Sequence, residues 1–137
     1  MALPSAAPLE TVSSARLWTS HILTALLALF LLFDSITKII RVEQVVKANV
    51  TLGVAEHLVL PIGSLLLACT IIYLVPMTSL LGAVLLTGYL GGAIAIHVRA
   101  GSGTFPVVFT LVTALLVWVP LVLREPRLGA LIAFRRW

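Results

Sequence analysis

Six side chains in the sequence could carry acid/base chemistry or hold a polar ligand, and the rest of the chain must bring them together. They are two carboxylates, two imidazoles and two cations, namely Asp34, Glu56, His57, His97, Lys38 and Arg99. A carboxylate and an imidazole in an apolar setting can be driven to different protonation states, as paired general bases and acids require. Asp34, Glu56 and His97 are therefore the candidate catalytic residues, and the other three are candidate ligand-binding residues.

The same residues also have a simpler interpretation, in which they form ion pairs that tie the ends of helices together. Asp34 and Lys38 are four positions apart. On a helix this spacing lets the carboxylate neutralise the ammonium group where the chain leaves the lipid. The sequence leaves both interpretations open.

A glycine-rich stretch between positions 88 and 103 leads up to two of these groups. Gly88 and Gly92 are four residues apart, which on a helix makes a smooth stripe that a second helix can approach closely. Tyr89 lies about two turns deeper than His97, with its direction roughly 80° away, so both can border one pocket. Gly88, Gly92 and Tyr89 are therefore added to the candidate ligand-binding residues.

The composition assigns the chain to the membrane. Of its 137 residues, 61% are hydrophobic and only 10% are charged, which is too apolar for a water-soluble domain of this size. One crossing of the hydrocarbon layer takes about 20 apolar residues, so the chain has room for four. We therefore predict an all-α, four-helix transmembrane bundle with both termini on the same side and membrane lipid as a partner.

Proline, glycine and polar residues mark the expected ends of the four helices. The helices are predicted at 17–40, 55–75, 80–98 and 105–123, with an interfacial segment at 41–54. Thr78 or Ser79 is expected to cap the third helix. The domain organisation is a disordered tail at 1–15, a transmembrane domain at 16–128 and an interfacial tail at 129–137.

This topology gathers the candidate site residues at one end of the bundle, because the first and third helices end there and the second begins there. We predict that Asp34, Glu56, Tyr89 and His97 face inward around a common cavity that opens toward the non-cytoplasmic side. Five arginines near the termini, against four cations at the other end, favour cytoplasmic termini.

Composition and spacing disfavour several other functions. The net charge of +4 comes largely from arginines near the C-terminus, so we expect contact with anionic lipid headgroups and no nucleic acid. The single cysteine, Cys69, rules out an intrachain disulfide and is expected to be a small buried apolar residue. Adjacent residues such as Glu56 and His57 point about 100° apart on a helix, so no metal site is predicted. The sequence identifies no cofactor.

Four segments of the chain resemble the DoxX-like family. They are Leu29–Lys38, Ile72–Ser79, Leu85–Arg99 and Leu123–Leu128. The resemblance implies a four-helix, multi-pass protein of the bacterial inner membrane, and the family's namesakes are membrane subunits linked to quinone reduction in thiosulfate oxidation. The implied fold is also similar to that of vitamin K epoxide reductase, whose paired cysteines this sequence lacks.

Three functions follow from these observations. The first is binding of a small lipophilic, quinone-like molecule in the bundle, which includes a role as a redox-linked membrane subunit served by an external electron source. The second is a membrane enzyme performing isomerisation or epoxide opening on a hydrophobic substrate, with Glu56 or Asp34 as base and His97 as acid. The third is a non-enzymatic assembly or accessory protein that contacts a protein partner or forms a homo-oligomer.

Overall fold

The structure, a computed structural model, describes residues 11–132, and every regular element in this range is a helix. The elements are α1 (Ser14–Ile39), α2 (Glu43–Thr51), the 3-10 helix η1 (Glu56–Leu58), α3 (Val59–Leu74), α4 (Ser79–Ala100), α5 (Thr104–Arg124) and α6 (Pro126–Ile132). Positions 1–10 of the predicted tail and positions 133–137 lie outside the described residues. The four long helices of the prediction are all present.

Local signals in the sequence explain where α1 begins and where α4 ends. The Ser13 hydroxyl accepts a hydrogen bond from the backbone N–H of Arg16 at 3.4 Å, which caps the first turn of α1. At the end of α4, Gly101 has a φ of 62°, a left-handed conformation that glycine adopts without strain. The backbone N–H of Ser102 then donates to the carbonyl of His97 at 3.2 Å and closes the helix end.

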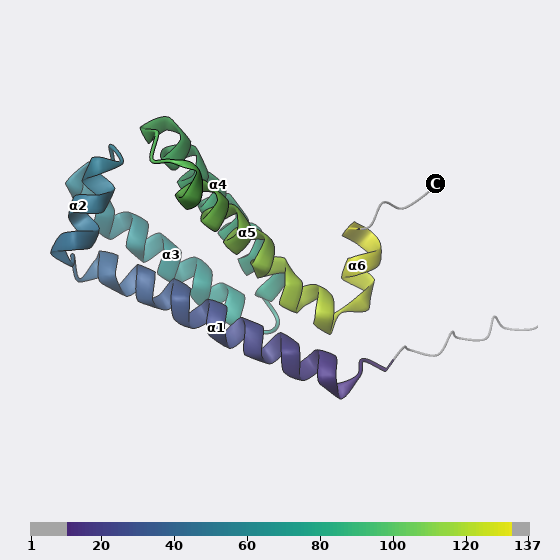
Figure 1. Cartoon of the computed structure of the whole chain (residues 1–137). Helices are drawn as coiled ribbons and strands as arrows, with labels where there is room; N and C mark the ends of the chain where they lie inside the picture. The colour runs from purple at the N-terminus through teal and green to yellow at the C-terminus, as the bar shows by residue number, and fades with distance from the viewer. Residues whose placement is uncertain (1–10, 133–137) are drawn as a thin grey trace, which may run out of the picture.

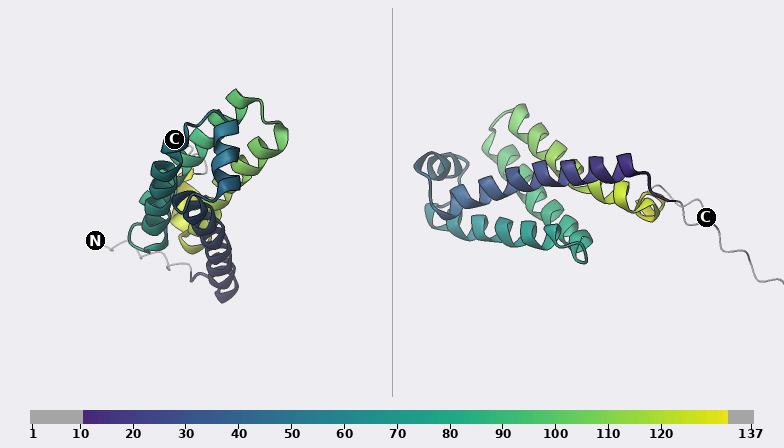
Figure 2. Two further views of the ribbon diagram at one scale, coloured as in Figure 1. Left: turned by 90° about the vertical axis from the view of Figure 1, so that its left-hand side faces the viewer. Right: turned by 90° about the horizontal axis from the view of Figure 1, so that it is seen from below.

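The four long helices form two antiparallel pairs, α1 with α3 and α4 with α5 (Figure 1). The pairs contact each other through α3 against α4 and α1 against α5. They lie close together where α1 begins and α5 ends, and they diverge toward α2 and the loop between α4 and α5 (Figure 2). The bundle is therefore shaped like a V.

Close backbone contact and buried hydrogen bonds hold the two pairs together at the narrow end, which we call the joint. A Cβ added at Gly82 would lie 2.3 Å from the Cα of Tyr73, so only glycine lets α4 approach α3 this closely. The buried Tyr73 hydroxyl donates to the carbonyl of Val117 at 2.8 Å. The Ser20 hydroxyl donates to the carbonyl of Pro120 at 2.9 Å. These bonds tie α3 and α1 to α5.

Four helical segments are long and apolar enough to cross a membrane, namely α1, the continuous stretch of η1 and α3, α4 and α5. Their outer faces carry large exposed hydrophobic side chains such as Leu26, Phe33 and Leu115, as helices surrounded by lipid tails require. The predicted all-α, four-helix transmembrane bundle is confirmed. The beginning of α1 and the end of α5 lie at the same end of the bundle, as the Ser20 to Pro120 bond shows.

The predicted helix–helix seam at Gly88 and Gly92 is wrong. A Cβ added at either position would meet nothing within 4 Å. The close approaches lie instead at Gly82 in the joint and at Gly63, where an added Cβ would lie 2.6 Å from the Cβ of Lys38. Glycines four apart permit a close helix contact, but their spacing does not say on which side the partner helix packs.

Two details at helix ends also differ from the sequence prediction. Within residues 11–132 no side chain caps α4; the Thr78 hydroxyl donates back to the carbonyl of Ile72 at 2.8 Å. The segment after α5 contains the short helix α6, which packs against α5. Leu128 of α6 contacts the hydrophobic core, and this residue lies within the transmembrane domain predicted at 16–128.

Candidate functional site

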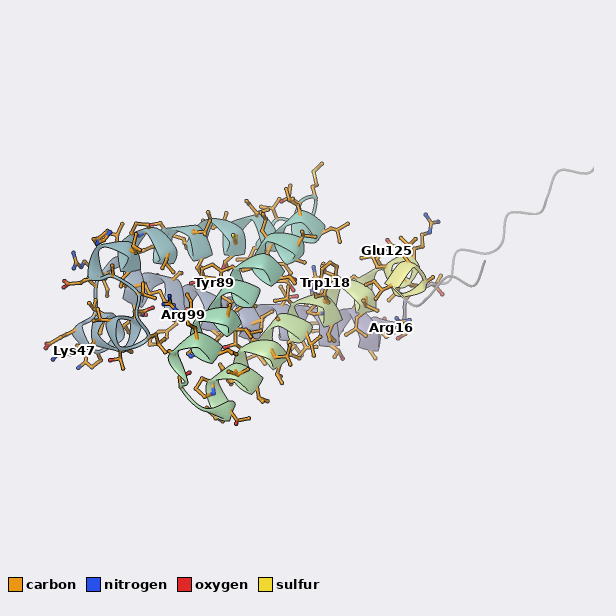
Figure 3. The ribbon with its side chains drawn as sticks, turned by 90° about the horizontal axis from the view of Figure 1, so that it is seen from above. Arg16, Lys47, Tyr89, Arg99, Trp118 and Glu125 are labelled. Carbon is orange, nitrogen blue, oxygen red and sulfur yellow. The ribbon has the colours of Figure 1, made fainter. Side chains whose placement is uncertain are left out.

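A cavity of about 880 Å³ lies between the two diverging helix pairs. Along α4 its lining extends from Val84 to His97, which corresponds to ~20 Å of helix. All four long helices contribute to its walls, and α2 contributes to its wide end. In Figure 3, Tyr89 lies midway along α4 and Arg99 lies near the end of that helix, close to α2. The space exists because the joint holds the pairs together at one end only.

Polar and apolar side chains are distributed unevenly around this cavity. Asp34 and Lys38 line it from α1, and Gln44 and Asn49 line it from α2 at the wide end. Toward the joint the lining becomes apolar. Two threonines of α5, Thr110 and Thr113, also line the cavity, but their hydroxyls donate to carbonyls of their own helix. The cavity is therefore amphipathic, with its free polar groups in the wide half.

Asp34 and Lys38 form an ion pair on α1, as their spacing predicts. Lys38 is buried and Asp34 is half-buried. The Cβ of Lys38 is packed against Gly63 of α3, so the base of the side chain is held at the α1–α3 contact while its ammonium group pairs with Asp34. A charge in an apolar setting is stable only when it is paired, and this pair contributes no net charge to the cavity.

Tyr89 projects from α4 into the cavity. Its ring packs against the hydrophobic core, and Asp34 and Cys69 line the same cavity. No buried side-chain polar atom in the described residues lacks a hydrogen-bond partner. The Tyr89 hydroxyl makes no hydrogen bond within residues 11–132, so it must be open to the cavity and can bond to a bound molecule.

His97 lines the wide end of the cavity from the last turns of α4. Its Nδ1 lies 2.9 Å from the Ser102 hydroxyl, which also donates to the His97 carbonyl at 3.1 Å. The loop after α4 therefore fixes the direction of the imidazole ring. Nε2 remains available to a ligand.

The space beside Gly88 and Gly92 belongs to the cavity, because both residues line it and neither has a neighbour within 4 Å of an added Cβ. Gly91, between them in the sequence, is equally open but does not line the cavity. The two outer glycines therefore widen the cavity.

Residues 22–120, which span all four membrane helices, match the DoxX-like family. The chain belongs to the DoxX-like family. Searches among curated proteins and among solved structures gave no match. The family assignment agrees with the resemblance of the sequence segments, but it does not identify a ligand.

Three of the candidate residues of this DoxX-like protein lie outside the cavity lining. Glu56 and His57 are exposed on η1, and Glu56 forms an ion pair with Arg41 at the end of α1. The guanidinium of Arg99 lies against Gly53, with Nη2 3.0 Å from the position of an added Cβ. The structure thus brings Asp34, Lys38, Tyr89 and His97 to one cavity but leaves Glu56, His57 and Arg99 outside it.

Sequence reasoning missed several residues that line the cavity of this DoxX-like protein. Cys69 is buried, as expected, but it also lines the cavity. Phe30 and Phe109 line it where α1 faces α5, with ring centroids 5.6 Å apart in an edge-to-face contact. The position of Cys69 midway along the second predicted helix is the one sequence signal that it could line a cavity. The divergence of the two helix pairs, which places Phe30 and Phe109 at the cavity, was not predictable from residue spacing.

Within residues 11–132, no group of three or more His, Cys, Asp or Glu side chains is arranged to hold a metal ion. Of the residue types that ligate metals, Asp34, Cys69 and His97 line the cavity. Asp34 is already paired with Lys38. The arrangement is suited to hydrogen bonding with an organic ligand.

Proposed function

We propose that this DoxX-like protein binds a lipophilic molecule with a small, uncharged polar head, of the quinone type, between its two helix pairs. The observation that carries the proposal is the cavity of about 880 Å³. It falls within the size range of small-molecule sites and is lined mainly by apolar side chains with few polar groups. Lipophilic molecules are concentrated in the surrounding bilayer, and the cavity lies among membrane-spanning helices.

The polar groups of the cavity favour a neutral head. The charges of Asp34 and Lys38 cancel within their ion pair, so a charged head would meet no free counter-charge there. The open hydroxyl of Tyr89 can donate a hydrogen bond to a carbonyl oxygen. A quinone offers two such carbonyls on an uncharged ring, and its apolar tail fits the half of the cavity nearer the joint.

A redox role follows only with a partner that supplies electrons. The chain has one cysteine, so it cannot form an intrachain dithiol couple. We therefore propose that the protein is the quinone-binding subunit of a redox system in the bacterial inner membrane. Electrons would come from a protein partner.

The structure favours the two alternative functions less. An enzyme with Glu56 as general base would need this carboxylate at the cavity, whereas Glu56 is paired with Arg41 outside it. A purely structural role accounts for the three ion pairs at this end of the molecule. It gives no reason for a large amphipathic cavity, because filling such a space would stabilise a bundle that binds nothing.

Two matched glycine variants test the proposal. Gly92→Leu places a side chain in the cavity, and Gly91→Leu places the same side chain on the same helix outside it. Purified protein in nanodiscs is titrated with decylubiquinone, whose fully substituted ring does not add to thiols. We expect the quinone to raise the unfolding temperature of the wild type and of Gly91→Leu, because a ligand that binds only the folded state stabilises it. Gly92→Leu should lose this shift.

Alkylation of Cys69 gives an independent measurement on the wild-type protein. Because Cys69 is the single cysteine and lines the cavity, bound quinone should slow its reaction with N-ethylmaleimide. Equal quinone responses in the Gly92→Leu and Gly91→Leu variants, or no response in the wild type, would exclude the cavity as a quinone site.

A further inference from the structure

The two ends of the bundle differ in how their charges are compensated. At the wide end every described carboxylate pairs with a cation, in the pairs Asp34–Lys38, Glu43–Lys47 and Glu56–Arg41. At the joint, none of the described arginines lies within 4.0 Å of a described carboxylate. The joint end therefore carries uncompensated positive charge in residues 11–132.

Arg124 is the centre of this charge. It ends α5 and turns toward α1, where its Nε donates to the Ser20 hydroxyl at 2.5 Å and its Nη2 to the Thr24 hydroxyl at 2.6 Å. Both partners are neutral. A guanidinium has five N–H donors, so three remain after these two bonds. The two hydroxyls hold the group in place without neutralising it.

A second arginine, Arg16, lies on α1 about one helical turn before Ser20, the residue that holds Arg124. Arg16 is four residues before Ser20, so the two side chains are neighbours on one helix face, with Cβ atoms about 6 Å apart. Arg16 is exposed (Figure 3). Arg127 follows at the beginning of α6 and is also exposed, while Glu125 is the one described acidic residue in this segment. Three cations against one anion leave this end positive.

The surroundings of these arginines are those of a membrane interface. Trp18, on the turn between Arg16 and Ser20, is 70% exposed, and exposed tryptophan is typical of the headgroup level. Leu17 and Ile22 are exposed large hydrophobic residues on the same part of α1. A molecule held by the arginines would therefore have its head at the lipid–water boundary and its chains along the apolar outer surface of α1.

We infer that Arg16 and Arg124 form a binding site for the phosphate of an anionic phospholipid at the joint. The guanidinium groups bind the phosphate oxygens, which accept charge-assisted hydrogen bonds from arginine in a forked geometry. A free phosphate shares the same chemistry. The exposed tryptophan and leucine beside the arginines favour the lipid.

The test measures which lipids the protein retains. Full-length protein is extracted from vesicles of equal parts phosphatidylglycerol and phosphatidylcholine, and the ratio of the two bound lipids is measured by native mass spectrometry. The wild type should retain phosphatidylglycerol preferentially. Arg124→Gln and Arg16→Gln should each lower this preference about fivefold, the contribution of one arginine near an anionic membrane surface. Lys47→Gln, which removes the same charge at the wide end, should leave the preference unchanged.

Each alternative outcome contradicts the inference. If Arg16→Gln retains the wild-type preference, the lipid site is wrong even if Arg124→Gln fails to fold, because Arg16 is exposed and makes no described side-chain contact that folding requires. If Lys47→Gln lowers the preference equally, net charge alone explains it. If added inorganic phosphate displaces the lipid completely, the site binds a free anion.

Discussion

Tyr89 differs from Asp34, Lys38 and His97 because its hydroxyl has no hydrogen-bond partner in residues 11–132. Asp34 and Lys38 satisfy each other, and His97 bonds to Ser102. A donor with no internal partner contributes little to folding but can contribute a full hydrogen bond to a ligand. Removing the Tyr89 hydroxyl should therefore lower ligand affinity without lowering the stability of the fold.

We expect Tyr89→Phe to lower quinone affinity about fivefold, since one neutral hydrogen bond contributes about 1 kcal/mol. The unfolding temperature without quinone should not change, because the ring and its packing against the core are retained. Titration of the thermal shift with decylubiquinone measures both quantities on the same samples. Unchanged affinity would mean that the hydroxyl does not contact the ligand head.

At the residue scale, the sequence predicted part of this cavity. Asp34, Tyr89 and His97 line it because their positions on helices of known direction place them at one end and on inward faces. Glu56 does not, because η1 turns the chain before α3 begins and leaves the carboxylate beside Arg41. A local change from α to 3-10 geometry has no clear signal in the residues Glu56-His57-Leu58.

The helices were more predictable than the contacts between them. Their ends follow from local signals, such as Pro76 after α3 and Gly101 after α4. Which glycine allows a close approach depends instead on the partner helix. Gly82 meets the backbone of Tyr73, whereas Gly88 meets nothing. The spacing of residues along one helix does not say which residues of another helix it will contact.

Gly82 and Gly91 on α4 give a matched test of this difference. An alanine Cβ at position 82 would overlap the backbone of Tyr73, at 2.3 Å from its Cα, whereas at position 91 it would meet nothing within 4 Å. We expect Gly82→Ala to destabilise the protein by about 3 kcal/mol through overpacking. Gly91→Ala should stabilise it by about 0.5–1 kcal/mol through its higher helix propensity.

Unfolding by increasing fractions of sodium dodecyl sulfate, followed by circular dichroism, measures both free energies. Both variants make the same chemical change in the same helix, so each is a control for the other. Similar stabilities would mean that α3 and α4 do not meet at Gly82 in the membrane.

For the molecule as a whole, the distribution of cations predicts which end of the bundle faces the cytoplasm. The excess of arginines near the termini favours cytoplasmic termini, and the uncompensated charge around Arg124 acts in the same direction. We expect Thr104→Cys, at the beginning of α5, to react with a membrane-impermeant maleimide on intact bacteria. Thr11→Cys, before α1, should react only after the cells are broken open.

Both sites are exposed, and both variants are made in a Cys69→Ala background so that the new cysteine is the only one. Labelling of position 11 in intact cells, with position 104 protected, would show that the protein is inserted the other way round. The cavity would then open toward the cytoplasm.

The V shape has a mechanical consequence for the bilayer. Because the helix pairs are joined at one end, the protein takes up more area in one leaflet than in the other, and the angle between the pairs sets that difference. A ligand that spreads or closes the pairs does work against the lateral pressure of the wider leaflet. Ligand affinity should therefore vary with acyl-chain composition and membrane curvature, so that the protein responds to the physical state of the bilayer as well as to ligand concentration.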